Sequence, residues 1–180
     1  MTRNRLIHFS LALFGACKDM NILDEAVKSL KYVREVLDHE NKLVLFFDSP
    51  LIMKENKKEV FKNIFKEKIN KYVLYFCYIL IDYDVIKYIH KIYREFKHLY
   101  NQEKGILEGK IYTCYELSDE ILAKLSSVLE KKYKKPVEFR QVYNKSLIGG
   151  IKIILEDQIY DFSINTKLNN IKENVLTNLK

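Results

Sequence analysis

The sequence predicts a mainly α-helical protein, with an N-terminal six-helix bundle over residues 1–104 and a small α+β domain with a β-hairpin over residues 105–180. Up to about residue 103, apolar residues recur at steps of three and four, which is the spacing of amphipathic helices. Gly15 is the only glycine before Gly105, so the sequence offers little to interrupt these helices. After Gly105, β-branched and aromatic residues occur in short runs typical of strands.

Six apolar runs mark the predicted helices of the bundle. The first helix carries an apolar stripe from Leu6 to Met20 and a second apolar face. Asn21 is the predicted N-cap of the second helix, and Asp82-Tyr83-Asp84 is predicted to cap the sixth. Pro50 limits the extension of the short third helix. The runs cover residues 6–20, 23–37, 43–47, 60–65, 69–80 and 85–100. Because the links between them are short, we expect a compact bundle.

The polar segment from Asn101 to Gly105 is the predicted boundary between the two domains. Beyond it, Ser118 is the predicted start of a helix that Pro136 prevents from continuing. A tight reversal at Glu156-Asp157 joins the two strands of the hairpin. The predicted order is a strand over 110–115, a helix from 118, a strand over 137–143, two hairpin strands and a helix over 166–179. This order favours a small α+β domain.

The formal net charge of +7 favours acidic partners, such as nucleic acid, an anionic membrane surface or an acidic protein. The excess is spread along the chain, and its only dense cluster lies at Lys131-Lys132 and Lys134-Lys135. RNA-binding proteins more often concentrate such charge beside exposed aromatics and glycines. A solvated helix face is the better reading of the cluster, and a basic RNA-associated module is kept as the alternative function.

The cysteines indicate a reducing compartment, and the apolar runs are too short for a membrane span. Cys17, Cys77 and Cys114 are odd in number, far apart and each in an apolar context, which favours buried free thiols. The longest apolar run, Tyr72 to Ile81, is about half the length that a membrane span needs. The N-terminus lacks the pattern of a signal or transit peptide. We therefore expect a cytosolic protein that attaches to membranes only through partners.

The sequence predicts no catalytic, cofactor-binding or metal-binding residues. Gly149-Gly150 lacks the remainder of a phosphate-binding loop, and a close backbone approach explains the pair better. His90 and His98 are eight residues apart, too far to share one metal ion on a helix. A small enzyme built on the C-terminal sheet is a third reading, which a pocket with strongly perturbed carboxylates would support.

The segment from Val142 to Leu168 resembles the C-terminal signature of the delta subunit family of F-type ATP synthases, which includes the mitochondrial oligomycin-sensitivity-conferring protein. The match begins with Ser-Leu-Ile-Gly-Gly and ends with Lys-Leu. Ser146, Gly149, Gly150, Asp161 and Ser163 are the structural residues that this signature assigns. Four positions depart from the family pattern: Asn144 replaces an Asp, Glu156 and Phe162 replace two glycines, and Asn165 replaces an Arg. The resemblance extends to Phe9–Cys17 near the start, whereas Asp82-Tyr83-Asp84 stands where relatives usually carry Asn-Gly-Arg.

The resemblance implies a non-catalytic stator subunit of a proton- or sodium-translocating ATP synthase, with no cofactor. In that family the helical bundle binds the N-terminal helix of an alpha subunit of the catalytic head. The C-terminal domain contacts the b subunits of the peripheral stalk. The implied location is the cytoplasmic face of the bacterial plasma membrane, as a peripheral part of the complex without a membrane span and without nucleic acid.

The family places the alpha-subunit helix between the first and fifth helices of the bundle. The residues expected to bind it are Phe9 and Leu13 on the first helix and Tyr72 and Phe76 on the fifth. A partner on one side explains why the first helix is apolar on two faces. A helix buried on all sides by the bundle explains the same pattern equally well.

Overall fold

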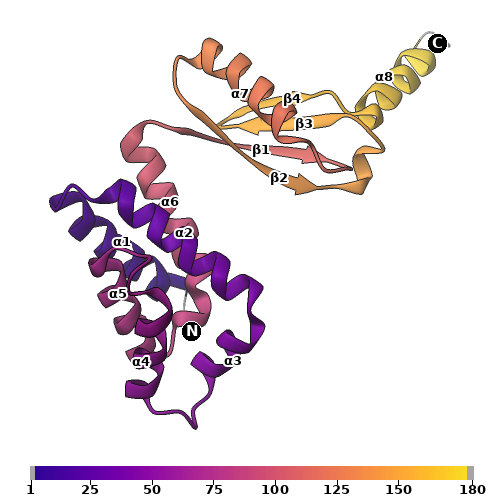
Figure 1. The fold of residues 1–180 in the computed structure, drawn as a ribbon. Coiled ribbons are helices and arrows are strands. Elements are labelled where there is room, and N and C mark those ends of the chain that lie inside the picture. The colour runs from indigo at the N-terminus through magenta and orange to yellow at the C-terminus, as the bar shows by residue number, and fades with distance from the viewer. Residues whose placement is uncertain (1–2, 178–180) are drawn as a thin grey trace. The chain divides into compact units, whose positions relative to one another are not determined.

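The computed structural model describes the backbone of residues 3–177 and the side chains of residues 4–172 (Figure 1). Within that range it contains eight α-helices and one small four-stranded sheet. The chain divides into two compact units, residues 1–100 and 101–180. The expected fold class, mainly helical with a small α+β part, is therefore confirmed.

Six α-helices start within the first unit, which has one hydrophobic core. They are α1 (Arg3–Asp19), α2 (Leu23–His39), α3 (Asn41–Asp48), α4 (Lys54–Phe65), α5 (Lys71–Asp82) and α6 (Ile89–Lys104), with a short 3-10 helix η1 (Ile86–Tyr88) before the last. Aromatic rings fill the core, where the ring centroid of Phe61 lies 4.4 Å from that of Phe65 and 5.8 Å from that of Phe47. The buried hydroxyl of Ser10 contacts the carbonyl oxygen of Ile92 at 3.1 Å and so joins α1 to α6.

Two predicted helix caps are wrong, because the residues end the preceding helix instead. Asn21 has a φ of 56°, and the amides of Asn21 and Ile22 donate to the carbonyls of Lys18 and Cys17 at the end of α1. Asp84 has a φ of 55° and closes α5 in the same way. Both are Schellman motifs, in which a residue in the left-handed conformation lets backbone amides donate to the last free carbonyls of the helix. Asn and Asp favour N-caps and also tolerate the left-handed conformation, so the sequence alone does not separate the two uses.

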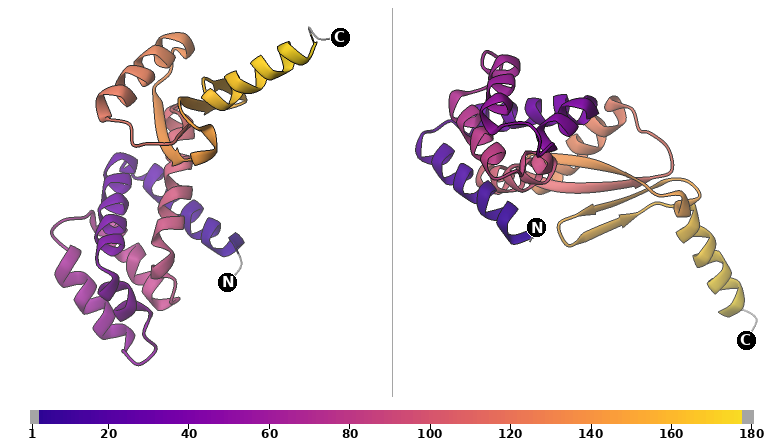
Figure 2. Two further views of the ribbon diagram at one scale, coloured as in Figure 1. Left: turned by 90° about the vertical axis from the view of Figure 1, so that its right-hand side faces the viewer. Right: turned by 90° about the horizontal axis from the view of Figure 1, so that it is seen from below.

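The second unit is a four-stranded sheet with α7 (Asp119–Tyr133) on one face, as Figures 1 and 2 show. The strands β1 (Leu107–Thr113), β2 (Val137–Tyr143), β3 (Ile151–Leu155) and β4 (Gln158–Asp161) lie in the order β2-β1-β3-β4. β1 and β2 are parallel, joined by α7 as a crossover, and the other pairs are antiparallel. Leu129 of α7 packs with Ile111 and Ile153 of the sheet in the core of this unit.

The predicted elements of this unit are all present: β2 has the predicted bounds, and several other elements have shifted ends. β1 covers residues 107–113 rather than 110–115, because Thr113 Oγ1 bonds with the backbone of Tyr115 and ends the strand in a turn. The segment Ser146–Gly150 does not open a strand: it contains a 3-10 turn η2 (Lys145–Leu147), and β3 begins at Ile151. The last helix, α8 (Ile164–Thr177), begins two residues earlier than predicted, directly after Ser163.

Candidate partner-binding faces

One side of α5 exposes large side chains to solvent. They are Tyr72, Tyr75, Ile79 and Tyr83. Steps of three and four residues place all four on the same side of the helix. On α1, the half-buried ring of Phe9 lies 6.5 Å from that of Phe76 and 5.6 Å from that of Tyr83. We call Phe9 together with these four residues, of which Tyr83 is the C-cap residue of α5, the α1–α5 face.

The four predicted binding residues have different environments. Tyr72 is exposed and Phe9 is half-buried, so both offer surface to a partner. Leu13 is 5% exposed and Phe76 is 7% exposed, and both belong to the core beneath the face. The sequence reading missed Tyr75, Ile79 and Tyr83, although their spacing with Tyr72 was visible in the sequence. A binding role for any of these residues stays a prediction.

The structure also distinguishes the two readings of the first helix. Leu11, Ala12 and Ala16 are exposed, whereas Leu6 and Leu13 are buried. α1 is therefore not enclosed on all sides by the rest of its unit. An apolar helix with one open side has room for a partner.

Three lysines of α4 surround the C-terminal end of α5. Lys54 Nζ lies 3.1 Å from an oxygen of Asp84 and also donates to the main-chain oxygen of Asp82. Lys57, which is only 2% exposed, places its Nζ 3.9 Å from the other oxygen of Asp84. Lys58 pairs with Asp82 at 2.6 Å. Positive charge beside a helix C-terminus is stabilising, so this cluster fixes the segment around Tyr83.

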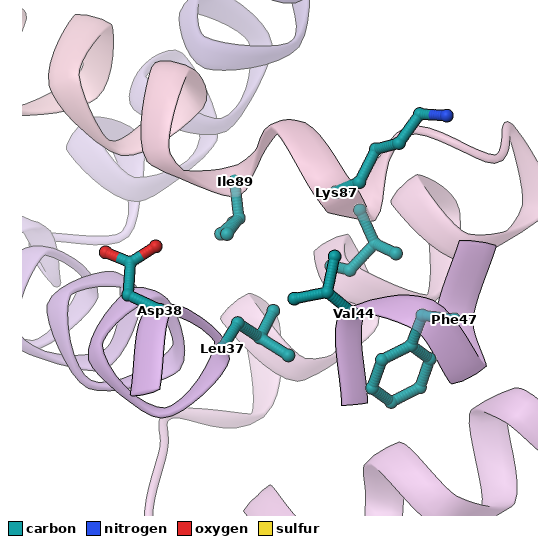
Figure 3. Close-up of a pocket in the computed structure, with 7 residues that line it drawn as sticks. Leu37, Asp38, Val44, Phe47, Lys87 and Ile89 are labelled. Carbon is teal, nitrogen blue, oxygen red and sulfur yellow. The ribbon is translucent and has the colours of Figure 1, made fainter. Parts of the chain in front are cut away.

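Two openings lie among the described residues: one is small, and the other is larger but open to solvent. The pocket of Figure 3 has a volume of about 20 Å³, enough for about one water molecule. Leu37, Val44, Phe47 and Ile89 line it, with the charged groups of Asp38 and Lys87 at its edge. A second depression, lined by Glu130, Lys134, Lys135 and Pro136, is open to solvent.

The described part of the chain contains no group of three His, Cys, Asp or Glu side chains that could hold a metal ion. Burial raises the pKa of Cys17 to about 11, so this thiol stays protonated at neutral pH. Residues 3–177 include no helix with the length and apolar character that a membrane crossing requires.

The signature glycines lie where the chain turns from η2 into β3. Gly150 has a φ of 76°, and a Cβ there would collide with the carbonyl oxygen of Phe162. A Cβ on Gly149 would lie 2.5 Å from the terminal methyl of Ile164. At the start of this turn, Asn144 Oδ1 accepts hydrogen bonds from the amide and the hydroxyl of Ser146. Because an amide oxygen accepts these bonds as a carboxylate does, Asn144 fills the place of the usual Asp.

Asp161 and Ser163 join β4 to α8. Asp161 Oδ1 accepts from the Ser163 amide at 2.9 Å, and the buried Ser163 hydroxyl accepts from the Thr166 amide at 3.2 Å. Hydrogen bonds from the side chain and backbone of Ser163 lower the pKa of Asp161, with Lys152 nearby adding to the effect. These contacts are all structural in kind, and each stabilises the junction between the hairpin and α8.

One side of the helix α8 exposes apolar side chains to solvent. Ile164, Leu168 and Ile171 are exposed at steps of four and three, so they share one side of the helix. α8 touches the rest of the unit mainly at η2 and extends away from the sheet in Figures 1 and 2. We call these three residues the α8 face.

The Lys131–Lys135 cluster is partly engaged within its own unit. Lys132 Nζ donates to the Tyr160 hydroxyl at 2.6 Å, and the Tyr133 and Tyr160 hydroxyls are 2.8 Å apart. The bond to Tyr160 raises the pKa of Tyr133 to about 12, whereas the bond from Lys132 lowers the pKa of Tyr160. These contacts tie α7 to β4, which is a structural use of part of the basic cluster.

Comparison with known proteins shows the family to which these two units belong. The family model described as ATP synthase delta (OSCP) subunit matches residues 8–175. The chain is similar to ATP synthase subunit delta of Clostridium beijerinckii, with 30% identity over 168 residues, covering 93% of this chain and 94% of that protein. The corresponding subunit of Clostridium botulinum (strain Langeland / NCTC 10281 / Type F) is 28% identical with the same coverage.

A chain of the Toxoplasma gondii mitochondrial ATP synthase hexamer has the same fold, with a TM-score of 0.73, 19% identity and 98% of both chains covered. Because the family model spans nearly the whole chain, the helical unit and the α+β unit are both included in the match. The chain therefore belongs to the ATP synthase delta (OSCP) subunit family, whose members are components of the peripheral stalk.

Proposed function

We propose that this chain is the tether that holds the catalytic head of an ATP synthase to the b subunits of its peripheral stalk. In this role residues 1–104 form a six-helix bundle that binds the head, and residues 105–180 contact the stalk. The subunit transmits force and catalyses no reaction. It works at the cytoplasmic face of the bacterial plasma membrane, attached through the complex. Family membership favours this reading over an RNA-associated module.

The observation that carries the proposal is the exposed aromatic side of α5. Three tyrosines and one isoleucine lie in a row in solvent, although α5 is otherwise buried in the core. An amphipathic helix that lays its apolar side on this row would bury several aromatic side chains, which supply much of the energy of such interfaces. We assign the α1–α5 face to the N-terminal helix of the alpha subunit, with Leu13 and Phe76 supporting it from beneath.

The α8 face is the corresponding candidate for the stalk. It is apolar, exposed and arranged along one side of a helix, which suits packing against the helical end of a b subunit. The Ser163 cap and the glycine turn fix the start of α8, so they set the direction in which it extends. In this account the signature residues position the stalk contact and do not bind it.

The assignment of the α1–α5 face is tested with Ile79→Asp, because Ile79 is 45% exposed and the substitution leaves the core intact. A synthetic peptide carrying the alpha N-terminal helix from the same genome is titrated into the full-length chain. We expect the variant to bind more than tenfold more weakly, with unchanged helical content by circular dichroism. Equal affinity for the variant and the wild type would remove this face from the proposal.

The matched test for α8 uses Leu168→Asp, with Asn169→Asp as its control. Both changes add one negative charge to an exposed position, but only Leu168 lies on the α8 face. We expect Leu168→Asp to lose a purified b-subunit helical fragment and Asn169→Asp to retain it. Retention by both variants would show that the stalk contacts another surface.

A further inference from the structure

Tyr83 is the member of the α1–α5 face with the least support from its own helix. It is the C-cap residue of α5 and is 57% exposed. One side of its ring packs on Phe9, with centroids 5.6 Å apart and planes tilted by 57°. Phe9 in turn packs edge-on against Phe76 of the core. The three rings therefore form a continuous aromatic path from the core to the surface.

The backbone on both sides of Tyr83 is held in place. The amide of Asp84 donates to the carbonyl of Ile81 at 3.0 Å, and that of Val85 donates to the carbonyl of Leu80 at 2.8 Å. The carboxylates of Asp82 and Asp84 are paired with lysines of α4. A side chain that is already ordered before association loses less conformational entropy on binding.

The charges along the α1–α5 face also indicate what it binds. Asp82 and Asp84 are neutralised by their lysine partners. Exposed Arg5 lies one turn before Phe9 on α1, and Lys71 lies over the ring of Tyr72 at the other end of the α5 row. A helix that fills this face is therefore apolar on one side and carries acidic residues at its edges.

We propose that Tyr83 is a contact residue for the helix that binds the α1–α5 face. This inference rests on the proposed function, in which that helix is the N-terminal helix of the alpha subunit. Tyr83 lies eleven residues after Tyr72, so the row of exposed side chains is about 16 Å long. The occupant therefore contacts the row over about three turns. The free side of the ring packs on the apolar side of the occupant, and its hydroxyl lies at the solvent edge.

The test compares Tyr83→Ala, Tyr83→Phe and a control, Tyr143→Ala, in the full-length chain. Tyr143 is similarly exposed but lies in the second unit. Affinity for the synthetic alpha N-terminal peptide is measured by titration calorimetry. We expect Tyr83→Ala to weaken binding about tenfold or more, and Tyr83→Phe and Tyr143→Ala to stay within about twofold of the wild type.

A photo-cross-linking measurement covers the case in which Tyr83→Ala does not fold. The aromatic photo-cross-linker p-benzoylphenylalanine at position 83 keeps a ring on Phe9, and the same group at position 143 is the control. Cross-linking of the peptide at 83 and not at 143 supports the proposal. Unchanged affinity of a folded Tyr83→Ala, or no cross-link at 83, overturns it. If the wild type itself does not bind the peptide, the proposed function of the α1–α5 face fails instead.

Discussion

At the scale of single residues, Gly150 shows how the chain reserves a position for glycine. Its φ of 76° lies in the left-handed region, and the carbonyl of Phe162 occupies the space that a side chain would need. Glu156 stands at a position where the family usually has glycine, and it keeps a positive φ of 51° in the hairpin turn. The chain therefore tolerates a side chain in the exposed turn, where no such collision is present, but has no room for one at Gly150.

Gly150→Val is expected to destabilise the second unit by about 2 kcal/mol or more, because strained dihedrals and a backbone collision add together. The control is Gly15→Ala, at an exposed position of α1 where a Cβ meets nothing within 4 Å. That change is expected to leave stability equal or raise it by about 0.5 kcal/mol. Urea unfolding followed by circular dichroism measures both. Equal midpoints for Gly150→Val and the wild type would contradict the structural role of this glycine.

Asp161 predicts a pH dependence at the start of α8. Its pKa is lowered below the usual value of an aspartate in the folded chain, so the unfolded chain binds the proton at higher pH than the folded chain does. The stabilisation is therefore complete above the unfolded pKa and is lost as the pH falls through the folded pKa. Thermal melts should show Asp161→Asn less stable than the wild type at neutral pH, with the difference shrinking in acid. A difference that is constant with pH would contradict this assignment.

At the scale of elements, periodicity predicted which segments form helices, but it did not predict how they end. Asn21 and Asp84 looked like N-caps and are left-handed C-terminal residues, because the same side chains suit both positions. The end of β1 depends on a turn formed by the Thr113 hydroxyl, and its parallel pairing with β2 depends on residues about thirty positions away. Local patterns carry little information on such contacts.

Only some residues of the candidate site could be predicted from the sequence. An apolar stripe identifies residues near an interface or a core, but it does not say on which side of the helix the neighbours lie. Tyr72 was predicted and is exposed, whereas Phe76, one turn later, is covered by the core. Tyr75, Ile79 and Tyr83 belong to the same row and were missed, because aromatic and aliphatic side chains are by default assigned to the interior.

The contact between α4 and α5 gives a prediction for Asp84→Asn. Asparagine keeps the left-handed backbone, so the change removes only the ion pairs with Lys54 and buried Lys57. Because Asp84 itself is exposed and screened, we expect a loss of about 1 kcal/mol. Asp19→Asn, at an exposed position of α1, is the control. Urea midpoints that are the same for both variants would mean that the lysine cluster does not stabilise the end of α5.

At the scale of the whole molecule, the two compact units need not unfold together. α6 ends at Lys104 and β1 begins at Leu107, so Gly105 and Ile106 are the residues between them. Limited trypsin digestion is expected to cut first between about Glu103 and Gly109 and to leave two resistant fragments. First cleavage within α1–α5, with this link intact, would contradict the division into domains at residues 104 and 105.

The central claim is that two separate faces hold two different partners. The most direct measurement is a pull-down from detergent-solubilised membranes with tagged wild type, Ile79→Asp and Leu168→Asp. We predict that the wild type retains alpha and b subunits, that Ile79→Asp retains b and loses alpha, and that Leu168→Asp retains alpha and loses b. Loss of both partners from a folded single variant, or retention of both by each variant, would contradict the account.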